Sequence, residues 1–312
     1  MLAILNEVQR SMSTRDRILA LCVVIVWGVN FVIIRFGLDG IPPFLLGGLR
    51  FLFVLFPALL FVPFPKAPLK LLVMYGLAMN FGQFAFLFSA IKLGMPAGLA
   101  SLVLQAQAFF TLLLCALFFR EKIRANHVLG IAVAGGGIAV LAMGQAPAAN
   151  ITALGFILTL CAALSWASGN LVNKRIGSVS PNDRILSVVV WSAAIPILPF
   201  FVCSYLFEGP DVIVSSLLNI DLKGVFSIIY LSFLSSIFGY SVWGNLLSRY
   251  ETWRVAPLTL LVPVVGLAAA WIVLDETLSI AQISGAVMVM VGLLINVFGA
   301  LIRRPRKPLS SQ

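Results

Sequence analysis

The sequence has little charge, because only 10% of its 312 residues are Asp, Glu, Lys or Arg, whereas 61% are hydrophobic. A water-soluble domain needs more charge than this to cover its surface, so the composition excludes a soluble fold. Apolar runs of about 20 residues recur along the chain, and each is long enough to cross a hydrocarbon core of about 30 Å. We therefore predict an integral membrane protein whose main partner is the lipid bilayer.

The chain is also poor in residues that carry catalysis or bind metals. It has one histidine and four cysteines, and every cysteine stands in an apolar run outside any C-x-x-C pair. The GxxxxGK[ST], HExxH and GxSxG motifs are missing from the sequence. We predict no enzyme activity, no metal and no cofactor.

A membrane-embedded enzyme, the alternative from another class, would need a nucleophile and base, or metal ligands, around one cavity. A structural or receptor-like protein, a third possibility, would lack a central cavity open to one side.

Basic residues outnumber acidic ones, and the net charge is +10. They stand in small groups between apolar runs and form no continuous stripe, which argues against a nucleic-acid partner. With the N-terminus in the cytoplasm, all Lys and Arg fall on the inner side except Arg35, Lys92, Lys223 and the intramembrane Arg50. The positive-inside rule thus predicts that both termini are cytoplasmic. We expect the membrane to be the bacterial inner (plasma) membrane. The sequence leaves monomer and oligomer open.

The apolar runs predict ten transmembrane helices, because a spanning segment must satisfy its own backbone hydrogen bonds. We place these spans at 17–37, 43–62, 70–92, 95–119, 126–144, 152–172, 185–206, 224–247, 254–274 and 279–301.

The chain repeats itself. At a spacing of 139 residues the matches are Cys22 with Cys161, Trp27 with Trp166, Arg35 with Lys174, Pro57 with Pro196, and Phe61 with Phe200. At a spacing of 155 they are Tyr75 with Tyr230, Glu121 with Glu276, Gly130 with Gly285, Gly137 with Gly292, and Gly144 with Gly299. The difference in spacing corresponds to a longer loop at 207–223 than at 63–69.

Each half has five spans, and because five is odd the second half enters the membrane from the opposite face. The predicted fold is an all-α integral membrane protein of ten transmembrane helices arranged as two inverted five-helix repeats. We assign 1–148 to the first repeat with its cytoplasmic tail, 149–302 to the second repeat, and 303–312 to a basic cytoplasmic tail. The glycines that recur every seven residues predict close helix packing in the fifth and tenth spans.

Polar side chains inside apolar spans are expensive unless they are paired or face a cavity, so they mark a candidate site. This set comprises Asn30, Arg50, Asn80, Gln83, Ser89, Ser101, Gln105, Gln107, Thr111, Trp166, Ser168, Asn170, Tyr230, Ser235, Ser236, Tyr240, Trp243, Asn245 and Thr259. Most of these residues are uncharged hydrogen-bonding groups, which suit a small polar or zwitterionic solute. The alternative for each amide and aromatic is packing or hydrogen bonding between helices.

Four further residues are candidates for gating or coupling. Arg50 is the only charge that lies away from the ends of a predicted span, and there it could attract a carboxylate, snorkel to the outer surface or cap helix carbonyls. Trp243 could gate the site or belong to an aromatic belt at the interface. Glu121 and Glu276 end matching spans on opposite faces, where we expect ion pairs or helix-end contacts, with coupling as the alternative.

Three stretches resemble the EamA family of the drug/metabolite transporter superfamily. They are WGVNFVIIRFGL (27–38), PAGLASLVLQAQAFFTLLL (96–114) and RYETWRVAPLTLLVPVVGL (249–267). The resemblance runs from about residue 12 to 302, and the third stretch is most similar to bacterial exporters of O-acetylserine and cysteine.

The resemblance implies export of a small zwitterionic amino acid, O-acetyl-L-serine or L-cysteine, with asparagine and glutamine as further candidates. It implies a cavity surrounded by spans one, three, four, six, eight and nine. The candidate substrate-binding residues are then Trp27, Asn30, Gln83, Gln105, Trp166, Asn170 and Tyr240. The alternative within transport is a metabolite or drug exporter of broader specificity. Because no acidic residue lies in a predicted span core, proton exchange and facilitated diffusion both stay open.

Overall fold

A computed structural model describes residues 12–143 and 152–302, and every regular element in these two ranges is helical. Ten helices in the described ranges are long and apolar enough to cross a membrane, which confirms the predicted number of spans. The predicted tail at 303–312 and the boundary between 148 and 149 lie outside the described residues.

The first half contains α2 (Thr14–Gly40), α3 (Pro43–Leu55) with η1 (Ala58–Leu60), α4 (Leu69–Tyr75) with η2 (Gly76–Gly82) and α5 (Gln83–Lys92), α6 (Ala97–Val103) with α7 (Ala106–Phe119), and α8 (Ala125–Met143). The second half contains α9 (Ala153–Val179), α10 (Ile185–Ser192) with α11 (Ala194–Cys203) and η3 (Ser204–Glu208), α13 (Leu222–Ile229) with η4 (Tyr230–Phe238) and α14 (Gly239–Arg249), α15 (Thr252–Val255) with η5 (Ala256–Leu260) and α16 (Leu261–Leu274), and α17 (Ile280–Ile302).

The repeat extends to the residues that start the first helix of each half. Ser13 Oγ accepts a hydrogen bond from the Asp16 amide at 3.2 Å, and Thr152 Oγ1 accepts one from the Gly155 amide at 3.1 Å. Ser and Thr are favoured at this position because their oxygens satisfy amides that have no partner within the helix. Both helices extend past the predicted ends, so Lys174 lies within α9 and not in a loop.

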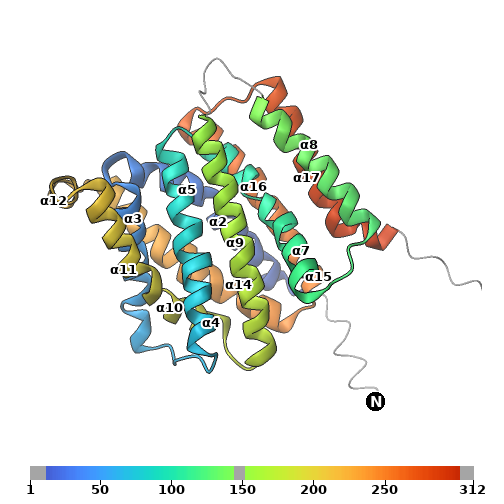
Figure 1. The fold of residues 1–312 in the computed structure, drawn as a ribbon, viewed down its shortest axis with the longest axis horizontal. Coiled ribbons are helices and arrows are strands. Elements are labelled where there is room, and N and C mark those ends of the chain that lie inside the picture. The colour runs from blue at the N-terminus through green and yellow to red at the C-terminus, as the bar shows by residue number, and fades with distance from the viewer. Residues whose placement is uncertain (1–11, 144–151, 303–312) are drawn as a thin grey trace, which may run out of the picture.

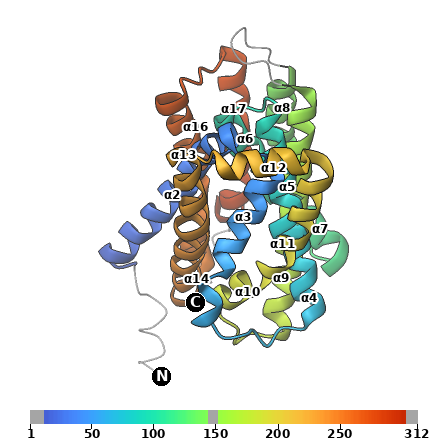
Figure 2. The same ribbon diagram turned by 90° about the vertical axis from the view of Figure 1, so that its left-hand side faces the viewer.

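The segment expected as the long 207–223 loop contains a helix, α12 (Pro210–Leu218). Pro210 occupies its first turn, where the missing N–H of proline costs nothing. None of its residues is buried, and Figure 2 shows α12 running across one end of the molecule. The inserted residues therefore form a surface helix, and the core of both halves keeps the same five-span order.

The matching helices α8 and α17 lie side by side along one edge of the molecule (Figure 1). A Cβ added to Gly130 would lie 2.7 Å from the Gly292 oxygen, and one added to Gly137 would lie 2.7 Å from the Gly285 oxygen. Residue numbers rise along one helix as they fall along the other, so the two helices are antiparallel. In the repeat, Gly130 matches Gly285 and Gly137 matches Gly292. The contact between Gly130 and Gly292 therefore corresponds to the contact between Gly285 and Gly137. The pair confirms both the predicted glycine packing and the inversion of the halves.

The two halves interlock around the same pseudo-twofold axis. In the first half, α2 packs against α13, η4, α14 and α16, which belong to the eighth and ninth spans. In the second half, α9 packs against α4, η2, α5 and α7, which belong to the third and fourth spans. The second and seventh spans pack on each other through α3 and α11. This exchange places the interface between the halves at the middle of the bundle.

Candidate functional site

A cavity of about 130 Å³ lies at this interface. Its wall comprises Trp27, Asn30, Phe31, Arg50, Gln83, Phe84, Leu87, Leu104, Gln105, Gln107, Trp166, Ser235, Tyr240, Thr259 and Val262. Six of the seven predicted substrate-binding residues are in this wall, the exception being Asn170. The structure also adds the second span to the six that the family resemblance implied, because Arg50 of α3 is part of the wall.

Asn170 lies behind the wall. Its Nδ2 donates hydrogen bonds to Gln107 Oε1 at 3.0 Å and to Thr111 Oγ1 at 3.1 Å. Asn170 follows Trp166 by one helical turn and faces α7, so it reaches the fourth span and not the cavity. In the structure it holds the amide of Gln107, and Gln107 itself lines the cavity.

Two amides in the wall have oxygens with no hydrogen-bond partner among the described residues. They are Asn30 Oδ1 and Gln83 Oε1, and their side chains belong to residues that are only 7% and 3% exposed. A buried polar atom left without a partner costs about 1–3 kcal/mol. Such atoms in a cavity wall are suited to a solute that supplies the missing donors.

Arg50 is also buried, with 2% of its surface exposed. The snorkelling alternative is therefore wrong, because the head group is enclosed by the protein and bonds to Ser236 of the eighth span. Its Nη2 donates to Ser236 Oγ at 3.0 Å, and its guanidinium carbon lies 3.9 Å from the centroid of the Phe84 ring. Among the described residues, Nε and Nη1 have no hydrogen-bond partner and Arg50 takes part in no ion pair. A charge at the centre of a membrane helix costs about 2.5–3.5 kcal/mol, so this arrangement calls for a counterion.

The third span of each half contains a π-helical turn, η2 and η4, at positions that match in the repeat. Trp27 Nε1 donates to the Ser235 oxygen at 3.0 Å in η4, and Ser165 Oγ donates to the Ala78 oxygen at 2.8 Å in η2. A π-helical turn shifts the backbone register and leaves carbonyls available for side chains. Each half's first span is thus anchored to the other half's third span beside the cavity.

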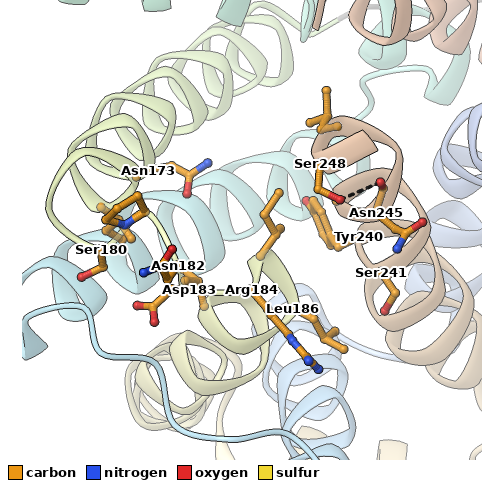
Figure 3. A pocket seen from close by; sticks show the side chains of 17 residues that line it. Asn173, Ser180, Asn182, Asp183, Arg184, Leu186, Tyr240, Ser241, Asn245 and Ser248 are labelled. Carbon is orange, nitrogen blue, oxygen red and sulfur yellow. Dashed lines mark hydrogen bonds between the residues drawn. The ribbon is translucent and has the colours of Figure 1, made fainter. Parts of the chain in front are cut away.

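A larger vestibule of about 860 Å³ opens between α9, α10 and α14. Figure 3 shows Asn245 and Ser248 on α14, across the opening from Asn173 and Asn182. Tyr240 lines both this vestibule and the central cavity, so its ring marks the boundary between them.

The matching region on the opposite face is closed. Gly177 and Asn245 line the vestibule, whereas Leu38 and Ala90, which occupy the same places in the other half, are both 0% exposed. The places that line the vestibule in one half are therefore packed shut at Leu38 and Ala90 in the other half. The candidate site therefore lies next to the vestibule, with Tyr240 between the two.

The remaining gating candidates lie outside the cavity wall. Glu276 accepts hydrogen bonds from the Ala97 and Gly98 amides at 2.8 and 2.9 Å and so joins the ninth span to the start of α6 on the closed face. Glu121 is paired with Lys174 on the vestibule face. The expected ion-pair and helix-end contacts are thus present.

Trp243 packs against Trp27, with ring centroids 5.4 Å apart. It supports the wall from behind and does not line the cavity. Its hydrophobic neighbours include Ala20 and Leu246, so it belongs to a small cluster between α2 and α14.

The sequence marked Gln107, Ser235 and Thr259 as polar residues inside spans, but the predicted substrate-binding set did not include these three wall residues. All three are polar groups inside apolar spans, which is the signal that marks them. The sequence alone does not tell which helix face points inward, because each of these spans has apolar neighbours on both sides of the polar residue.

Comparison with known proteins gives a family and a fold. The model of the EamA-like transporter family matches residues 17–143 and 153–298. A "Probable amino-acid metabolite efflux pump" of Salmonella typhimurium is 58% identical over 94% of this chain and 98% of its own length. A protein of the same name in Escherichia coli is 55% identical over 95% of this chain and 99% of its own. A solved crystal structure with 20% identity superposes with a TM-score of 0.60 over 94% of this chain and all of the other.

Proposed function

The chain belongs to the EamA-like transporter family, and from this premise we propose that it exports small amino-acid metabolites from the cytoplasm by alternating access. The expected cargo is O-acetyl-L-serine and L-cysteine, with asparagine and glutamine as further candidates. The expected location is the bacterial inner membrane with both termini cytoplasmic, so the vestibule would open to the cytoplasm. The two relatives named as metabolite efflux pumps support the general class of activity.

The observation that carries this proposal is the central cavity with its unpartnered amide oxygens. Asn30 Oδ1 and Gln83 Oε1 come from different spans and belong to the wall of one buried cavity, where an ammonium group could donate to both. An ammonium group has three donors, and it satisfies such oxygens without a fixed negative charge in the wall. Because the cavity lies between two inverted halves, rocking of the halves would expose it to each face in turn.

Cavity size separates this proposal from a drug exporter. Pockets for drug-sized ligands have volumes of about 300–1,000 Å³, whereas the central cavity has about 130 Å³. The wall therefore fits a compact solute in this conformation. A broad-specificity exporter would need a wider and more aromatic chamber.

The test is efflux of radiolabelled O-acetyl-L-serine and L-cysteine from proteoliposomes that contain the purified protein. Asn30→Ala and Gln105→Ala should each lower efflux at least about tenfold, since each removes a hydrogen-bonding group from the wall. Asn219→Ala is the matched control, because this amide is exposed and its side-chain hydrogen bonds within the described residues go to Ser215 of α12. Normal efflux by both cavity variants would show that the site assignment is wrong. Transport of toxic compounds without amino-acid efflux would instead favour the broader exporter.

A proton gradient imposed on the same liposomes addresses energy coupling. The described part of the cavity wall contains no Asp, Glu or His. Accumulation of substrate against its gradient would demonstrate proton exchange, whereas equilibration alone would demonstrate facilitated diffusion.

A further inference from the structure

Arg50 has the geometry of a binding group and not of a structural ion pair. The ion pairs among the described residues, such as Arg249 with Asp16 and Arg35 with Asp39, lie near span ends. Arg50 is instead buried near the middle of the second span and beside the cavity. Its counterpart in the repeat is Val189, so the fold itself does not require a charge at this place.

The eighth span holds the guanidinium in a fixed position. Ser236 Oγ accepts from Arg50 Nη2 at 3.0 Å, and Ser232 Oγ donates to the Arg50 carbonyl at 3.0 Å. Both serines lie in η4, the π-helical turn, and the ring of Phe84 covers one side of the guanidinium. This support satisfies one nitrogen and leaves Nε and Nη1 with no partner among the described residues.

The cavity wall thus has two chemically different parts. One part supplies guanidinium donors, for which a carboxylate is the preferred partner in a site that excludes water. The other part supplies the amide oxygens of Asn30 and Gln83, which suit an ammonium group. A zwitterionic amino acid complements both parts, whereas a simple amine would leave Arg50 unpaired and next to a second positive charge.

We propose that Arg50 binds the carboxylate of the substrate and makes a free carboxylate a requirement for binding. The proposal rests on the proposed function, because it assigns the substrate class of the same cavity. It also explains a buried cation with no acidic partner in the described part of the chain: the counterion arrives with the cargo.

Three thiol compounds separate the contributions of the carboxylate and the ammonium group to binding. L-Cysteine has both charged groups, 3-mercaptopropionate lacks the ammonium group, and cysteamine lacks the carboxylate. Binding of each is measured by titrating the purified protein and following its thermal unfolding, because a ligand that binds the folded state raises the melting temperature with concentration. We expect the wild-type protein to bind L-cysteine and 3-mercaptopropionate at least about tenfold more tightly than cysteamine.

The Arg50→Met variant should bind all three compounds with similar, weak affinity, and Arg50→Lys should recover part of the preference for carboxylates. Ser236→Ala keeps the charge but releases the guanidinium, so it should weaken both carboxylate compounds by a similar factor and leave cysteamine unchanged. This variant tests the proposal even where Arg50→Met fails to fold. Arg35→Met is the control, since it removes an exposed arginine from outside the cavity.

The outcomes separate this proposal from the proposed function. Equal binding of cysteamine and L-cysteine by the wild-type protein would overturn the role of Arg50, as would an unchanged preference in Arg50→Met or Ser236→Ala. Absence of efflux from proteoliposomes, together with a carboxylate preference that depends on Arg50, would overturn the export function alone.

Discussion

Trp27 shows how a single residue joins the packing of the bundle to the cavity wall. Its ring contacts Tyr240 at a centroid distance of 5.4 Å, and its indole N–H donates to a carbonyl of the π-helical turn η4. Gly239 makes room for this contact, because a Cβ there would lie 2.6 Å from Trp27 Nε1. The ring thus fixes the first span against the eighth beside the site.

Trp27→Phe should keep the aromatic contact with Tyr240 but leave the Ser235 carbonyl without its donor. We expect a loss of about 1 kcal/mol in the free energy of unfolding, together with slower efflux. Trp271→Phe is the control, because Trp271 is 63% exposed on the outside of the bundle. Thermal unfolding and efflux of both variants give the measurement, and equal behaviour of the two would contradict the anchoring role.

For single residues, the sequence predicted the chemical character of the cavity wall better than the direction in which each side chain points. Polar residues in apolar spans located most of the wall, since a polar group in a membrane span needs a partner or a cavity. Asn170 and Arg50 show what was missing. The first turns toward Gln107 and the second turns away from the surface, and both directions depend on how neighbouring helices rotate, which one sequence does not contain.

Among the elements, the pair of α8 and α17 gives the most direct view of the inverted architecture. Glycines bring the two backbones into contact, as is typical of membrane helices that associate through small residues. Asn126 Nδ2 also donates to the Asn296 oxygen at 3.2 Å across the pair.

Gly137→Ala should destabilise this pair by about 1–3 kcal/mol, because the new Cβ would meet backbone atoms of α17 at 2.7–2.8 Å. Gly135→Ala is a matched control on the same helix, with no atom within 4 Å of its added Cβ. Since alanine is the better helix former, the control should be neutral or stabilising by up to about 1 kcal/mol. Thermal unfolding of the two purified variants is the measurement, and similar destabilisation in both would contradict the close packing.

The ten spans follow from hydrophobic length, and their ends differ from the prediction by a few residues up to the two extra turns at the end of α9. The π-helical turns in the third and eighth spans were not predicted. Carbonyls in these turns accept hydrogen bonds from Ser165 and Trp27 of the opposite half. The hydrophobic pattern of one span does not indicate that another span supplies such a donor. The helix α12 was missed because it is a short exposed element in a segment that showed only as an insertion.

For the whole molecule, the internal repeat predicted the inverted arrangement, and the antiparallel α8 and α17 confirm it. The repeat does not predict which face is open. Two conformations related by the pseudo-twofold axis use nearly the same contacts, so their difference lies in side chains that break the symmetry, such as Asn245 against Ala90.

The most direct test of this account is thiol labelling from each side of the membrane. Asn245→Cys and Ala90→Cys are introduced separately after Cys22, Cys115, Cys161 and Cys203 are replaced, and sealed vesicles of both orientations are treated with a membrane-impermeant reagent. Asn245→Cys should react quickly from the cytoplasmic face, because it lines the vestibule, and Ala90→Cys should react slowly from the outer face, because its place is packed shut. Fast labelling of Ala90→Cys from outside with protection of Asn245→Cys, or labelling of both from one face, would contradict an inward-open carrier built from two inverted halves.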